Sequence, residues 1–92
     1  MNKEKKEFNL IEGIFSAVEA KEILTTLIND KIKFHDYKIF SQEERFGKAN
    51  AETLARKAQL LEIKERLIEY LDQYHNSDQK LRIHSNIHIL TN

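Results

Sequence analysis

The sequence contains no cysteine, no proline and no tryptophan, and only two of its 92 residues are glycine. Without cysteine the chain can form neither disulfides nor thiolate metal sites, and it cannot use a thiol as a nucleophile. The absence also fits a reducing compartment. Because proline is missing and glycine is rare, the ends of helices and strands must be set by capping side chains and polar clusters.

The sequence also has no excess of positive or negative charge. Fifteen lysines and arginines balance fifteen aspartates and glutamates, so no overall field attracts the chain to nucleic acid or to an anionic membrane. No stretch reaches the length of about 18 apolar residues that a membrane span needs, and the amino terminus lacks the apolar core of a signal peptide. The sequence predicts one small cytoplasmic domain that does not interact with membranes.

A strand and a helix are expected near the amino terminus. Alternating hydrophobicity predicts a strand over about residues 7–14. Its two faces would carry Phe8, Leu10 and Ile14 on one side and Ile11 and Phe15 on the other. The capping-box pattern from Ser16 to Glu19 then predicts a helix start, and apolar residues at three- and four-residue steps extend that helix to about residue 30.

The middle of the chain is read as an irregular or helical connection over residues 31–47. Residues 31–40 favour a helix, because their alternation as a strand is poor, and the strand remains the alternative. A second capping box, from Ser41 to Glu44, predicts a new short helix that Gly47 ends.

The longest helix is expected over about residues 51–74, with Asn50 as its cap. A wide apolar face places Leu61 and Leu67 in the core and Glu62 on the solvated side. At 1.5 Å per residue this helix would be roughly 36 Å long, so its end is expected to project or to pack on a second chain. Residues 75–79 read as a turn.

The last strand, LRIHSNIHIL, follows this turn and raises the question of a metal site. His84 and His88 share its polar face, but four strand residues separate them by about 13 Å, too far for one ion that binds ligands at about 2 Å. Neither a nucleophile with a base nor a glycine-rich phosphate loop appears. The sequence therefore predicts no catalytic residue, no metal, no cofactor and no enzymatic activity.

These elements predict an α+β fold of β-α-α-β order. Two amphipathic helices would cover a short antiparallel sheet within a single domain of residues 7–92, after a disordered tail of residues 1–6. A two-stranded sheet is marginally stable alone and leaves two open edges. Self-association, with a dimer favoured, would cover them. The residues expected at such an interface are Leu71, Tyr74, Ile83, Ser85, Ile87 and Ile89.

One segment is a candidate for contact with nucleic acid. Its residues combine cations that neutralise phosphates with aromatic rings that stack on bases. They are Lys31, Lys33, Phe34, Tyr37 and Lys38. The neighbouring Asp30 and Asp36 dilute this charge. The leading hypothesis is therefore a non-enzymatic homo-oligomeric interaction or scaffold module, and a small nucleic-acid-associated regulator is the alternative.

The chain also resembles a family of short, uncharacterised bacterial proteins. The resemblance is carried by the segments FNLIEGIFSAVEAKEIL, KIKFH, SQEERFG and LRIHSNIHI, which together span nearly the whole chain. It implies a complete stand-alone protein and supplies no activity and no site residues.

Overall fold

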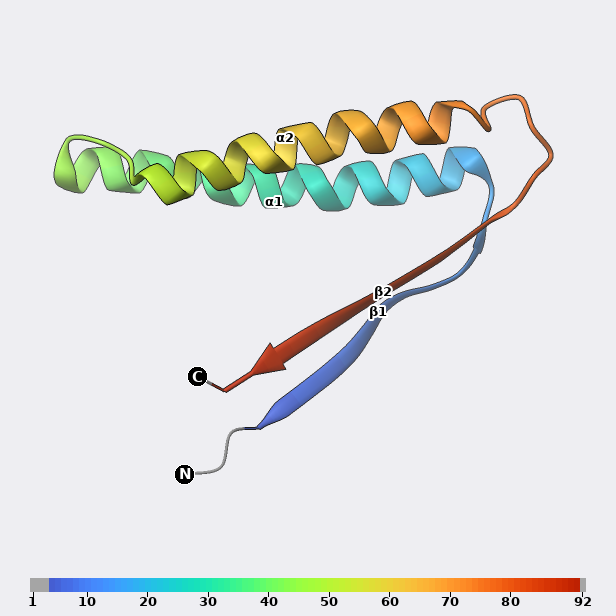
Figure 1. Ribbon diagram of the computed structural model, residues 1–92, viewed down its shortest axis with the longest axis horizontal. Coiled ribbons are helices and arrows are strands. Elements are labelled where there is room, and N and C mark those ends of the chain that lie inside the picture. Colours follow the sequence, from blue (N-terminus) through green and yellow to red (C-terminus); the bar gives the residue numbers. More distant parts are fainter. Residues whose placement is uncertain (1–3, 92) are drawn as a thin grey trace.

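The computed structural model describes residues 4–91 and has the order β-α-α-β (Figure 1). Strand β1 spans Lys5–Phe15, helix α1 Ala17–Phe46, helix α2 Ala51–Asp72 and strand β2 Leu81–Leu90. The two strands form one antiparallel sheet. The predicted α+β class and the order of its elements are confirmed.

Helix α1 is one continuous helix of 30 residues, so the predicted break near residue 30 is wrong. The capping box at its start is confirmed, because the Glu19 amide donates to Ser16 Oγ at 3.1 Å and the Ser16 amide donates to Glu19 Oε1 at 2.9 Å. The helix ends at Gly47, whose φ of 79° is left-handed and favours glycine. No glycine or proline interrupts the segment between these two ends.

The second predicted capping box is also wrong, because α1 continues through it. Ser41 and Glu44 lie inside α1, where the amides that a cap would satisfy already have helical partners. Gln42 instead bridges to the other helix, because its Nε2 donates to Thr53 Oγ1 at 3.1 Å and its Oε1 accepts from the Asn50 amide at 2.8 Å. The helical alternative for residues 31–40 is confirmed.

Helix α2 has 22 residues and is shorter than α1, so the prediction that it is the longest element is wrong. Its predicted cap is confirmed, since Asn50 Oδ1 accepts from the Glu52 amide at 2.7 Å. It ends at Asp72, two residues before the predicted end, and a turn follows. The Lys21–Asp72 ion pair, at 3.1 Å between Nζ and Oδ1, joins the start of α1 to the end of α2.

A β-bulge changes which residues of β1 share a face. The pairing runs regularly from Phe15 opposite Leu81 to Ile11 opposite Ser85, then skips Leu10 and resumes with Asn9 opposite Asn86. The extra residue brings Phe8 opposite Ile87, onto the face of Ile11 and Phe15. The predicted separation of Phe8 from Ile11 is therefore wrong, because simple alternation cannot anticipate a bulge.

Strand β1 also begins earlier than predicted. Lys5 and Lys6, which were expected in a disordered tail, pair with Leu90 and Ile89. Glu4 of that predicted tail accepts a backbone hydrogen bond from Thr91 at 2.9 Å, and residues 1–3 lie outside the described residues. Pairing over ten residue pairs makes the sheet a long arm with two strands.

The molecule is a flat V that measures 51 × 37 × 14 Å. The helices form one arm and the strands form the other, and the arms meet where β1 leads into α1 and diverge from there (Figure 1). The helices thus leave the outer part of the sheet uncovered, and Phe8 and Ile89 there are each 55% exposed. The expected covering of the sheet by the helices is only partial.

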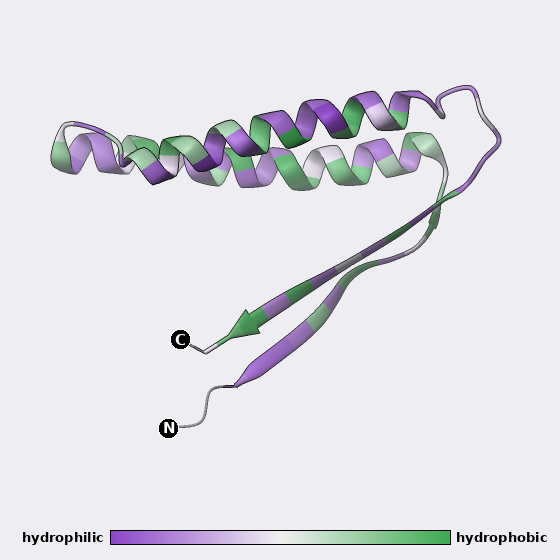
Figure 2. Cartoon of the chain, in the orientation of Figure 1, coloured by the Kyte–Doolittle hydropathy of each residue, from purple (hydrophilic) through white to green (hydrophobic). Residues whose placement is uncertain are grey.

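The core is correspondingly small. Its buried apolar residues are Ile11, Ala17, Ala20, Ile28, Leu60 and Leu71. Within the described part of the chain no large side chain is completely buried. Hydrophobic residues recur along the strand arm and around both helices, although much of that surface faces solvent (Figure 2).

Candidate self-association surface

The inner face of the strand arm is apolar and exposed. Residues 81, 83 and 85 of β2 are half-buried on this face, and Ile87 and Ile89 farther along it are exposed. Phe8 lies beside Ile87 as its cross-strand partner. An apolar strip therefore runs along the arm and emerges from the cover of α1 as the arms diverge.

A cleft of about 680 Å³ lies between this strip and helix α1. Leu27 and Phe34 line it from the helix, and Leu10 and Ile87 line it from the sheet. Phe34 is 64% exposed, so the wall of the cleft is incompletely packed. Leu10 reaches this cleft as the extra residue of the bulge. The alternating pattern of the sequence carries no signal for that position.

Both strands have one unpaired edge, because the sheet has only two strands. Ile83, Ser85, Ile87 and Ile89 of β2, four of the residues expected at an interface, share the inner face beside this edge. The edge contains no proline, and its inner face carries no charged residue that would oppose pairing with another strand.

The two helical residues expected at the interface lie elsewhere. Leu71 is 4% exposed and packs within the chain, so it is not free to contact a partner. Tyr74 is half-buried just beyond the end of α2. Its hydroxyl lies 3.3 Å from the Tyr70 hydroxyl, and this hydrogen bond raises the pKa of Tyr74 above its usual value.

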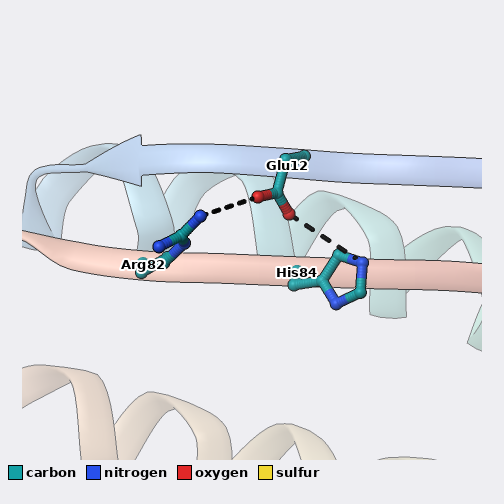
Figure 3. A network of polar contacts seen from close by, with 3 residues as sticks. All are labelled: Glu12, Arg82 and His84. Carbon is teal, nitrogen blue, oxygen red and sulfur yellow. Dashed lines mark hydrogen bonds and ion pairs between the residues drawn. The ribbon is translucent and has the colours of Figure 1, made fainter.

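The outer face of the sheet is polar. Glu12 on β1 points toward two residues of β2, with Oε1 at 3.2 Å from Arg82 Nη2 and Oε2 at 3.9 Å from His84 Nε2 (Figure 3). Farther along, Glu7 Oε1 lies 3.3 Å from His88 Nδ1. Each histidine therefore has a cross-strand carboxylate neighbour. These side chains are about half-exposed, so the attraction between them is weak.

No group of three or more potential metal ligands occurs within residues 4–91. The two histidines of β2 and their carboxylate neighbours are separate pairs, on either side of the Asn9–Asn86 pair.

The candidate nucleic-acid segment is divided between two sides of α1. Lys31 and Phe34 line the cleft, and Lys38 lies one heptad after Lys31 on the same side. Lys33 and Tyr37 lie on the other side, because two residues advance about 200° around a helix. Phe34 and Tyr37 are both exposed, but the three lysines do not form one patch.

Comparisons with protein-family models, with curated proteins and with solved structures find no match. The resemblance to short bacterial proteins accordingly stays a prediction. Among the described residues, no helix combines the length and the apolar character that a membrane crossing requires.

Proposed function

We propose that the protein is a non-enzymatic module that functions by associating with copies of itself, with the free edge of β2 as the first contact. The observation that carries the proposal is the exposed area. The chain exposes 7657 Å². A compact monomer of 10.9 kDa exposes about 5,600 Å². An excess of roughly 2,000 Å², rich in apolar side chains, indicates a surface that needs a partner.

The dimensions of the chain support the same reading. Its radius of gyration is 16.8 Å. A compact domain of this length has a radius of gyration of about 12 Å. The V shape accounts for this difference, because the sheet extends away from the helices instead of packing along them. A second copy that fills the space between the arms would restore a compact shape.

A twofold axis through Asn86 would cover part of this exposed surface. Antiparallel pairing of β2 with its copy would make a continuous four-stranded sheet and satisfy the free backbone groups of that edge. It would also place the exposed Ile87 and Ile89 of each chain beside the corresponding face of the other. Because the formal net charge of the chain is zero, overall electrostatic repulsion between two copies is weak.

The absence of cysteine allows a direct test by a single substitution. In an Asn86→Cys variant, twofold pairing would bring the two thiols opposite each other, with Cα atoms about 4.5–5.5 Å apart, which is within disulfide range. We expect this variant to form a disulfide-linked dimer under mild oxidation in dilute solution. Non-reducing electrophoresis measures the yield.

Asn9→Cys is the matched control, because Asn9 is the cross-strand partner of Asn86 and lies on the other strand of the same sheet. Efficient crosslinking of this variant in place of Asn86→Cys would move the interface to β1. Light scattering of the unmodified chain gives the independent check. A mass of 10.9 kDa at micromolar concentration would contradict self-association altogether.

A further inference from the structure

Helix α2 carries a second apolar stripe that is largely exposed. One set of positions faces α1 and includes the buried Thr53, Leu60 and Leu71. The second set lies beside this face and is mostly exposed, and it repeats at alternating steps of three and four residues. It consists of Ala51, Leu54, Ala58, Leu61, Glu65 and Ile68. We refer to this set as the outer seam.

The outer seam has the spacing of a coiled coil, in which the first and fourth positions of each heptad meet a neighbouring helix. Leu54 in the first turn of α2 is 47% exposed, and Leu61 in the middle of the helix is 45% exposed. The side chains of Ala58, Leu61 and Ile68 line a shallow groove along the helix. Its small alanine lets another helix approach closely.

The exposed area leaves room for this second contact. A standard interface removes about 800 Å² from each partner, and the chain exposes roughly 2,000 Å² more than a compact monomer of its size. One interface of that size at the strand edge would leave more than half of the excess uncovered. The outer seam, with Leu54 and Leu61 exposed, is a candidate for the rest of it.

The charges that flank the seam indicate what fits it. Lys57 and Lys64 run along one side, and Glu62 and Glu69 run along the other. In a parallel pair of identical helices, each flanking residue faces the residue five positions later in the partner, which sets Lys64 opposite Glu69. An antiparallel pair would set like charges together. The seam is therefore complementary to a second copy of itself in parallel orientation.

Two of the four charged residues that flank the seam already have ion-pair partners among residues 4–91, and two do not. Lys57 is paired with Asp36 of α1, and Glu62 Oε1 lies 2.7 Å from Arg66 Nη2. Lys64 and Glu69 form no ion pair in the part of the chain that the structure describes. These two residues are thus the ones whose charges a partner can satisfy.

We infer that α2 is a second self-association site, at which the outer seams of two copies pack in parallel. This inference goes beyond the strand-edge contact and does not depend on it. Each contact relates two copies by its own twofold axis, so a chain that uses both assembles beyond a dimer, into a closed tetramer or an extended array. Such an assembly would suit a scaffold.

Glu65 interrupts the seam and limits its strength. In parallel pairing its carboxylate would face the same residue of the partner, and two like charges at one layer destabilise the contact. Replacing it with an apolar residue should therefore tighten the association. We expect Glu65→Ile to lower the dissociation constant at the seam by at least about tenfold.

Sedimentation velocity of the full chain tests the seam itself. We expect Leu61→Glu to raise the dissociation constant by about 30-fold or more, because it places a charge at the centre of the contact. Ile63→Glu is the matched control, since Ile63 is also 45% exposed but lies about half a turn away around α2. Circular dichroism confirms that both variants keep their helices.

Charge reversal decides the orientation. We expect Lys64→Glu and Glu69→Lys each to weaken association by about two- to tenfold, and the double variant to regain most of the loss. A stronger association of Lys64→Glu would overturn the parallel arrangement. Equal masses for Leu61→Glu, Ile63→Glu and the unmodified chain would overturn the seam as an interface.

The experiments distinguish the strand-edge contact from the seam contact. If only the strand edge associates, Asn86→Cys still crosslinks and Leu61→Glu has no effect on mass. If only the seam associates, Leu61→Glu yields monomers and Asn86→Cys does not crosslink. The first pattern overturns the seam, and the second overturns the strand-edge proposal while it supports the seam.

Discussion

Leu60 and Leu61 are neighbours in the chain, yet Leu60 is 2% exposed and Leu61 is 45% exposed. Successive residues of a helix differ by about 100° in direction, and α1 covers only one side of α2. The expectation that Leu61 lies in the core is therefore wrong, and Leu60 takes its place. Leu67, the other predicted core residue, is half-buried.

This contrast predicts unequal effects of two identical substitutions. Leu60→Ala should lower the free energy of unfolding by about 2–5 kcal/mol, because it leaves a cavity between the helices. Leu61→Ala should cost less than half as much within one chain, since its side chain already meets solvent. Urea denaturation at several protein concentrations separates the effect on folding from any effect on association. Equal losses would contradict this orientation of α2.

The two serines of the capping-box patterns should differ in the same way. Ser16→Ala removes a real cap and should lower the free energy of unfolding by about 0.5–2 kcal/mol. Ser41→Ala changes an exposed residue inside α1 and should alter it by no more than about 0.5 kcal/mol. Thermal denaturation followed by circular dichroism measures both. A cost at Ser41 that matches the cost at Ser16 would contradict a continuous α1.

Acid should weaken the start of α1. The hydrogen bond from the Ser16 amide lowers the pKa of the Glu19 carboxyl below its usual value of 4.5. A hydrogen bond with the Ser16 side chain lowers it further, by a smaller amount. A lowered pKa in the folded state means that the stabilisation is present above the usual value and is lost as the pH falls through the lowered value. The stability difference between the unmodified chain and Glu19→Gln should therefore shrink below pH 4.5. Urea titrations at a series of pH values check this, and a constant difference would contradict the role of the carboxylate.

Nucleic acid should bind only weakly. Because Lys33 lies on a different side of α1 from Lys31 and Lys38, no single face presents all three cations to a phosphate backbone. Fluorescence titration with DNA or RNA of mixed sequence should show no binding tighter than the nonspecific range of about 10⁻⁴ to 10⁻⁶ M. Submicromolar binding that is lost when these three lysines are replaced by alanine would support a nucleic-acid-associated regulator instead.

Local signals in the sequence predicted much of the secondary structure. Ser16 with Glu19, Asn50 and Gly47 each mark a helix end through contacts within a few residues, so the chain around each one carries the whole signal. The same signal misled at Ser41, because a capping pattern cannot act where the preceding residues already form a helix. That context extends beyond the pattern itself.

The candidate surfaces were only partly predictable. The edge of β2 follows from a sequence that provides only two strands, and its alternating residues indicate which face is apolar. The cleft does not follow, because it depends on the bulge at Leu10 and on the angle between the two arms. Hydrophobic periodicity also did not separate the α1-facing positions of α2 from the outer seam, so the sequence predicted one wide core face.

The sequence by itself determined the types and order of the elements and most helix ends, because helix caps and hydrophobic periods act over a few residues. Only the tertiary structure decided that the sheet extends away from the helices and that α1 covers Leu60 but leaves Leu61 exposed. Those outcomes depend on how segments far apart in the chain pack against each other. A small core that leaves apolar faces without a neighbour is the reason we propose self-association as the function of this protein.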